Sequence, residues 1–182
     1  VIAKKSGEKI MELLEKNIRP ADILTRDAFM NAIAVDMAIG GSSNTVLHLI
    51  ALAHELDIEI ELETFDEISK KVPRLCSFSP GGNYHIEDLY RAGGLQTVIA
   101  ELARAGHFNL NVVTCTGMTM ADNIKGMVNK DPEVVRPIEN PYYSEGGIAI
   151  LRGNIAPEGA VVKQSAVAPE MLVHTGPARI FD

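Results

Sequence analysis

The sequence predicts an α/β protein in which a long, mainly helical part is followed by short strands. Most of the chain up to Pro137 has apolar residues spaced as in amphipathic helices. After that point, residues 146–154 and 159–163 are brief β-rich runs bounded by glycines and prolines, which is typical of strands joined by turns. We therefore expect two domains, residues 1–140 and residues 141–182.

The first helix is expected at residues 4–17, where apolar residues share one side of a helical wheel and charged residues the other. After a connector, Thr25 can cap a helix over residues 26–37. Gly40 and Gly41 should end that helix, because glycine tolerates the left-handed backbone of a helix terminus. A further helix is expected at residues 45–56, so that two helices meet at a glycine-rich turn.

Residues 58–62 alternate apolar and acidic side chains, which predicts a short half-buried strand. Residues 64–67 resemble a capped helix start. Residues 86–105 again have helical spacing, although the glycine pair at 93–94 should break that helix or pack closely against a neighbour. A last short helix is expected at residues 119–128.

The composition is that of an ordinary globular protein, with 182 residues, 46% hydrophobic and 23% charged. A formal net charge of −7 with scattered basic residues argues against nucleic-acid and anionic-membrane partners. The longest apolar stretch, residues 45–56, is shorter than the ~20 residues that span a bilayer. Two isolated cysteines, Cys76 and Cys115, fit a reduced protein, so we expect a cytoplasmic location.

The strongest local signal for a binding site is the run Gly41-Ser42-Ser43-Asn44, which follows Gly40. Backbone N–H groups at a helix N-terminus, reached through glycines without a Cβ, favour a carboxylate or a phosphate. The serines and Asn44 add short polar side chains. The same residues equally suit an ordinary capped turn between helices, which is the more common use of such a run.

The histidines and cysteines predict no metal site. His48 and His54 are six residues apart, so they do not form an i, i+4 metal pair, and we expect His48 in the core. His85 is either a substrate or acid–base contact or part of a helix start rich in acidic residues. Cys76 and Cys115 are expected to be buried, and two thiols cannot hold a cluster that takes three or four protein ligands.

Several short motifs occur in a fixed order along nearly the whole chain. They are NAIA (31–34), GGSSNT (40–45), YHIEDL (84–89), RAGG (91–94), RPI (136–138), GIAILRGN (147–154), GAVVK (159–163) and TGPARIFD (175–182). Together they resemble the dihydroxy-acid and sugar-acid dehydratase family. Within that family, the motif at 84–88 looks more like the enzyme of branched-chain amino-acid biosynthesis than the 6-phosphogluconate enzyme.

The resemblance implies a hydro-lyase that converts a small 2,3-dihydroxy acid to a 2-keto acid in valine and isoleucine biosynthesis. In such enzymes a cluster iron acts as a Lewis acid for the departing hydroxyl, and Mg²⁺ orients the substrate. The alternatives are a 6-phosphogluconate or other sugar-acid dehydratase, and a non-catalytic binding module that kept the same fold.

The family's iron–sulfur cysteines, magnesium ligands and catalytic serine have no counterpart in this sequence, so we assign no catalytic and no metal-binding residue. The resemblance places Gly41, Ser42, Ser43 and Asn44 in the active-site wall as substrate contacts. Because the sequence starts at Val1 without an initiator Met, we expect an internal piece of a longer enzyme that is inactive alone.

The resemblance also implies an architecture. Residues 1–140 would be the C-terminal part of a three-layer α/β domain with a parallel sheet, and residues 141–182 would begin a β-barrel-like, swivelling domain. It further implies a homodimer, with the active site between the α/β domain and the β-barrel-like domain.

Overall fold

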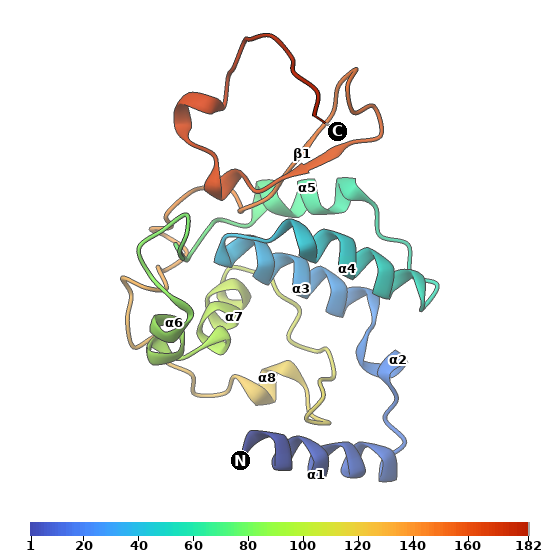
Figure 1. Ribbon diagram of the computed structural model, residues 1–182. Helices are drawn as coiled ribbons and strands as arrows, with labels where there is room; N and C mark the ends of the chain where they lie inside the picture. The colour runs from blue at the N-terminus through green and yellow to red at the C-terminus, as the bar shows by residue number, and fades with distance from the viewer. Residues whose placement is uncertain (182) are drawn as a thin grey trace.

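The structure is a computed structural model that describes residues 1–181. These residues form a mainly helical α/β fold with one small sheet (Figure 1). The helices are α1 (Ile2–Glu15), α2 (Pro20–Ile23), α3 (Arg26–Ile39), α4 (Ser43–His54), α5 (Leu62–Lys71), α6 (Ile86–Ala92), α7 (Leu95–Arg104) and α8 (Met120–Asn123). The strands are β1 (Ala149–Leu151) and β2 (Ala160–Val162), followed by two 3₁₀ turns, Gln164–Ala166 and Pro169–Met171.

Helix α3 is the centre of the core. Phe29, Ile33 and Met37 recur every four residues along one face and are all buried. Helices α4, α5 and α7 pack around this helix. The Thr25 hydroxyl accepts a hydrogen bond from the Ala28 N–H at 3.3 Å, which confirms the predicted cap of α3.

The predicted break within residues 86–105 is confirmed. Helix α6 ends at Gly93, where φ is +121°, and Gly94 with φ +77° precedes α7. Side chains other than glycine rarely adopt such φ values, so the glycine pair makes the sharp turn between the two helices possible.

The two strands β1 and β2 pair antiparallel, with Ala149 opposite Val162 and Leu151 opposite Ala160. They lie at the top of Figure 1, where β1 packs against α5 and β2 against α4. Both strands fall within the two predicted β-rich runs. The three-layer arrangement with a parallel sheet and the β-barrel-like domain remain predictions.

The strand predicted at residues 58–62 is wrong. The Ile58 N–H instead bonds the Ala53 carbonyl at 2.9 Å and closes the end of α4, while Asp57 adopts a left-handed φ of +55°. Leu62 already belongs to α5, so that helix begins before the predicted start at residues 64–67. The alternating pattern arose from a helix-to-helix connection in which Ile60 is buried.

The helix predicted at residues 119–128 is shorter than expected and ends at Asn123. The helix is capped at its start by Thr119, whose hydroxyl accepts a hydrogen bond from the Asp122 N–H at 3.2 Å. Its end follows from Gly126, whose φ of +75° is incompatible with a continuing helix.

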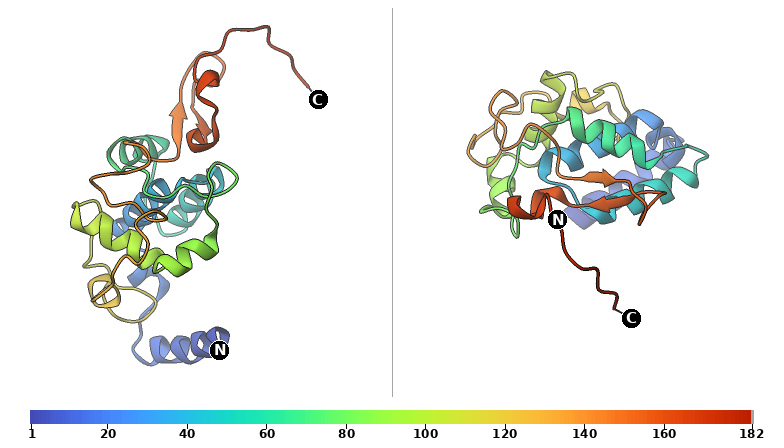
Figure 2. Two further views of the ribbon diagram at one scale, coloured as in Figure 1. Left: turned by 90° about the vertical axis from the view of Figure 1, so that its left-hand side faces the viewer. Right: turned by 90° about the horizontal axis from the view of Figure 1, so that it is seen from above.

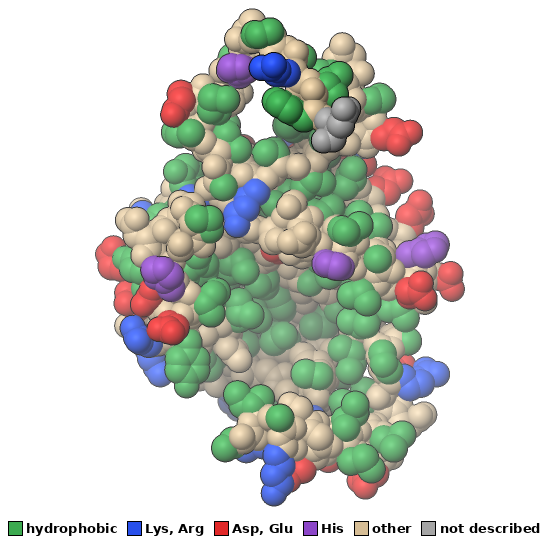
Figure 3. All heavy atoms as spheres, in the orientation of Figure 1, with side chains coloured by type: hydrophobic (Ala, Val, Ile, Leu, Met, Phe, Trp, Pro, Cys, Tyr) green, Lys and Arg blue, Asp and Glu red, His purple; other side chains and the backbone are tan. Residues whose placement is uncertain are grey.

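The two ends of the described chain lie at opposite ends of the molecule, with α1 at one end and the segment after β2 at the other (Figure 2). Hydrophobic side chains gather on the surface between α4 and α1 (Figure 3). An apolar groove of ≈ 410 Å³ is lined chiefly by α3 and residues 108–115, with Ile23 of α2 at its edge. Among residues 1–181, none of the helices has the length and apolar character needed to cross a bilayer.

Candidate functional site

The turn between α3 and α4 is built from two glycines in left-handed conformations. Gly40 ends α3 with φ +107°, and Gly41 follows with φ +73°. Ser42 is the residue that precedes α4, which begins at Ser43, two residues before the predicted start at Thr45. Ser43 and Asn44 open the helix and are exposed. The four predicted substrate contacts, Gly41 to Asn44, therefore lie together on one turn.

A buried carboxylate lies beneath this turn. Asp36 is only 7% exposed, and its two oxygens accept hydrogen bonds from the Ser42 N–H at 3.4 Å and the Thr45 hydroxyl at 3.1 Å. In the described part of the chain, the Ser42 side chain makes no capping bond to α4. Asp36 thus stabilises the start of α4 through these two hydrogen bonds. The exposed side chains of Ser43 and Asn44 do not take part in them.

The first N–H groups of an α-helix have no partner inside the helix. At α4 these groups belong to Ser43 and Asn44, which face solvent, together with Thr45, whose N–H bonds the Ser42 carbonyl at 3.0 Å. They carry partial positive charge from the helix dipole. The turn can therefore present N–H donors and short polar side chains to an anionic group.

The segment around β1 and β2 holds the turn from its other side. The Gly147 N–H bonds the Met37 carbonyl at 3.2 Å, and the Ser165 N–H bonds the Gly147 carbonyl at 3.2 Å. The Ser165 hydroxyl donates to the Gly40 carbonyl. A Cβ on Gly41 would lie 2.7 Å from Ile148, so only glycine fits at this contact.

The buried position of Asp36 should make the stability of the protein depend on pH. Burial raises the pKa of this carboxyl above that of an unfolded Asp, which is about 3.9. Between these two pKa values the folded protein binds more protons than the unfolded chain, so its free energy of unfolding should fall as pH rises through this window. The variant Asp36→Asn has no proton to lose and should lack this decrease.

This prediction is tested by urea unfolding of the wild type and Asp36→Asn at a series of pH values from about 4 to about 8. The difference in unfolding free energy, wild type minus variant, should become smaller as pH rises. The variant Glu59→Gln, which removes an exposed carboxylate, should retain the wild-type slope. A wild-type-minus-Asp36→Asn difference that is constant with pH would contradict the prediction.

Two predictions about histidine and cysteine are wrong. His48 is exposed rather than in the core, because the buried face of α4 is formed by Val46 and Ala53. Cys115 is exposed, because it lies in a tight turn where the Thr114 N–H bonds the Met118 carbonyl at 2.9 Å.

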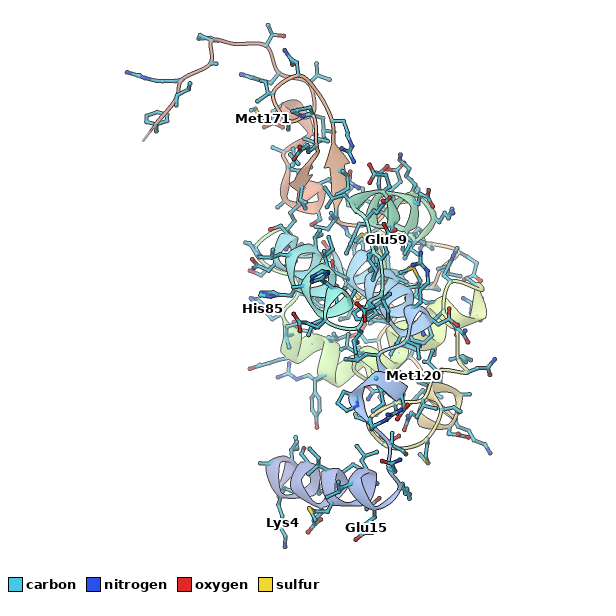
Figure 4. All side chains as sticks on the ribbon, turned by 90° about the vertical axis from the view of Figure 1, so that its right-hand side faces the viewer. Lys4, Glu15, Glu59, His85, Met120 and Met171 are labelled. Atoms are coloured by element: carbon cyan, nitrogen blue, oxygen red, sulfur yellow. The ribbon has the colours of Figure 1, made fainter. Side chains whose placement is uncertain are left out.

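His85 lies at the edge of the molecule, and its side chain points outward (Figure 4). The backbone N–H of His85 donates to the Asp88 carboxylate at 2.8 Å, and Glu87 and Asp88 occupy the first turn of α6. The cluster 85–88 therefore has the geometry of a helix start, where acidic side chains are favoured by the helix dipole.

The described residues do not fit the metal groups that the resemblance implies. Among residues 1–181, His, Cys, Asp and Glu form no group of three that could hold a metal ion. Cys76 is fully buried, and this burial raises the pKa of its thiol to about 12, which opposes the thiolate form that binds iron. We therefore derive no catalytic step through a metal bound to these residues.

Comparisons with known proteins decide the family. Residues 1–123 match the family described as "Dihydroxy-acid/6-phosphogluconate dehydratase N-terminal", and residues 133–182 match "Dihydroxy-acid/6-phosphogluconate dehydratase C-terminal". The chain belongs to this dehydratase family. The resemblance predicted from the motifs is confirmed.

Several members of the family are closely similar to this chain. Proteins named dihydroxy-acid dehydratase from Ruminiclostridium cellulolyticum, Acetivibrio thermocellus and Carboxydothermus hydrogenoformans are 59%, 58% and 56% identical over 181 residues. Each match covers 100% of this chain and 33% of the relative. The chain thus spans about a third of the length of the curated dehydratases that it matches.

Sequence reasoning found the turn but missed the residues that support it. Asp36 looks like any polar residue of a helix, and Ser165 lies 125 residues from the carbonyl that it bonds. An acidic residue six positions before the residue that caps the next helix is the one signal that points to Asp36, and no local pattern indicates Ser165.

Proposed function

We propose that the chain forms part of a dihydroxy-acid dehydratase, a hydro-lyase that removes water from a small 2,3-dihydroxy acid to give a 2-keto acid. The identity of 55–59% with curated proteins of that name, extending over the whole of this chain, is the observation that carries the proposal. The pathway that we propose is valine and isoleucine biosynthesis, with a cytoplasmic homodimer as the working form.

The part that we assign to this segment is substrate binding by Gly41, Ser42, Ser43 and Asn44. The substrate has a carboxylate and two hydroxyls, and the turn offers outward N–H groups at the start of α4 with two exposed polar side chains. Asp36 below the turn keeps the backbone fixed in this arrangement. A preorganised backbone donor loses little entropy when it binds an anion.

In the complete enzyme an iron–sulfur cluster and Mg²⁺ would supply Lewis-acid chemistry. We propose that their ligands and the catalytic base belong to parts of the longer protein outside this segment, since the described residues do not fit a metal group. The proposed domain organisation assigns residues 1–140 to the α/β domain and residues 141–182 to the barrel-like domain. The apolar groove near α2 is a surface of the kind that further chain would cover.

Substitution in a full-length protein that contains this segment tests the proposal. Asn44→Ala and Ser43→Ala should each lower kcat/KM for a branched 2,3-dihydroxy acid about tenfold, as expected when a hydrogen bond to a charged group is lost. The melting temperature should change little, because both side chains are exposed. Asn154→Ala, an exposed asparagine in the turn between β1 and β2, serves as the matched control.

Equal losses of kcat/KM in the control and in Asn44→Ala would contradict the role of the turn. Other outcomes would favour one of two other functions. The family description includes 6-phosphogluconate dehydratases, so higher turnover on 6-phosphogluconate than on the branched dihydroxy acid would favour that function. Absence of turnover on both, in a full-length protein loaded with its metals, would favour a binding module.

A further inference from the structure

Arg74 is a buried cation in the segment that follows α5. It is 5% exposed, and its guanidinium stacks over the Tyr143 ring at 3.9 Å from the ring centre. Its backbone N–H bonds the Tyr143 carbonyl at 2.9 Å, and its carbonyl accepts from the Tyr142 N–H at 2.9 Å. The backbone of Arg74 is therefore held by hydrogen bonds to the segment that carries the Tyr143 ring.

The hydrogen-bonding capacity of Arg74 is mostly unused. A guanidinium has five N–H donors. Within residues 1–181, the side chain makes one hydrogen bond, from Nη1 to the Ser165 carbonyl at 3.3 Å, and its Nε is buried with no partner. No carboxylate among these residues forms an ion pair with it. Buried charges in proteins are normally paired, because an isolated one is costly.

Two cavities meet at Arg74. The smaller one, of ≈ 20 Å³, also borders Gly40 and Lys163 and has room for one water. A water could satisfy a single N–H group, but it could not balance the positive charge. The larger cavity, of ≈ 220 Å³, has room for a small organic molecule.

The lining of the larger cavity indicates the chemistry of a ligand. Part of the wall is polar, with Gln164 and with Ser165, whose carbonyl accepts from Arg74, and part is apolar, with Val167 and Leu172 on the C-terminal segment. Glu145 also borders the cavity, and its charge acts on Lys70, whose pKa is raised chiefly by the hydrogen bond to Asp66 and to a smaller extent by Glu145. A molecule with a carboxylate at one end and a short aliphatic tail at the other would match both walls.

We propose that this cavity is a binding site for a small aliphatic carboxylate, held by an ion pair between its carboxylate and the Arg74 guanidinium. The fork of an arginine matches the two oxygens of a carboxylate, which makes such pairs strong and directional. The residues that line this cavity do not include Ser42, Ser43 or Asn44 of the exposed turn. It is therefore a separate site from the proposed substrate contacts, although Ser165 borders the cavity and also bonds the Gly40 carbonyl.

Isothermal titration calorimetry on the purified full-length protein that contains this segment tests this proposal, with sodium 3-methylbutanoate as the ligand and 3-methylbutanamide as its neutral, isosteric control. The acid should bind with a Kd in the millimolar range, as expected for so few heavy atoms. The amide should bind at least tenfold more weakly. Equal affinities for acid and amide, or no heat of binding with the acid at about 50 mM, would overturn the proposal. The cavity would then not be a carboxylate-binding site.

Two variants locate the site. Arg74→Met keeps the aliphatic stem without the charge and should weaken binding of the acid at least tenfold. The matched control is Arg136→Met, because Arg136 stacks on the neighbouring Tyr142 at 4.0 Å in the same way but does not border the cavity; it should bind as the wild type does.

Leu172→Glu keeps the test decisive if Arg74→Met does not fold. Leu172 is exposed at the rim of the cavity, so a glutamate there should not unfold the protein but should repel the ligand and weaken its binding severalfold. Wild-type affinity in a folded Arg74→Met variant, or in Leu172→Glu, would exclude this cavity as the site.

Discussion

Replacing Gly147 with alanine should lower the free energy of unfolding by about 3 kcal/mol, at the upper end of the cost of overpacking. The added Cβ would overlap the backbone of Gly40, which cannot move aside as a flexible side chain can. Gly147 also exchanges backbone hydrogen bonds with Met37 and Ser165, at 3.2 Å each. Any shift that relieves the overlap would break these bonds.

The measurement is chemical denaturation of Gly147→Ala beside Gly153→Ala. Gly153 is exposed, and a Cβ added there would meet no atom within 4 Å. The control should therefore be within ~0.5 kcal/mol of the wild type. A Gly147→Ala variant as stable as the control would mean that the segment around β1 does not pack on the α3–α4 turn as described.

The helical part of the fold was largely predictable because its signals are local. Thr25 at the start of α3 and the glycine pair between α6 and α7 act within one turn of the backbone, and both were identified correctly. The strand predicted at residues 58–62 failed because alternation also arises in a short connection with one buried residue, Ile60. Periodicity over five residues does not separate these two cases.

The candidate site was predictable only in part. The run Gly41 to Asn44 specified a turn at a helix start, which the structure contains, whereas its role in substrate binding remains a prediction. Asp36 and Arg74 acquire their importance from burial, and burial depends on contacts between distant parts of the chain. A sequence read one window at a time carries no such information, which is why both residues were missed.

Replacing Phe65 with alanine should have the largest effect, a loss of about 3–5 kcal/mol in the free energy of unfolding. Phe65 is 0% exposed on α5, the helix that packs against both α3 and β1 (Figure 1). Truncation would leave a cavity at the junction of the helical core and the small sheet. Since single domains are stable by only about 5–15 kcal/mol, much of the total would be lost.

The matched control is Phe181→Ala, which removes the same side chain from a position that is 81% exposed and should change stability by no more than ~0.5 kcal/mol. Near-ultraviolet circular dichroism alongside denaturation distinguishes local from global effects. The Ser69 hydroxyl on α5 donates to the Ile148 carbonyl, and the Ser69 backbone carbonyl accepts from the Gly146 N–H at 2.8 Å. Displacement of α5 should therefore also loosen the segment that supports the α3–α4 turn. A Phe65→Ala protein of wild-type stability would show that α5 does not join the two parts.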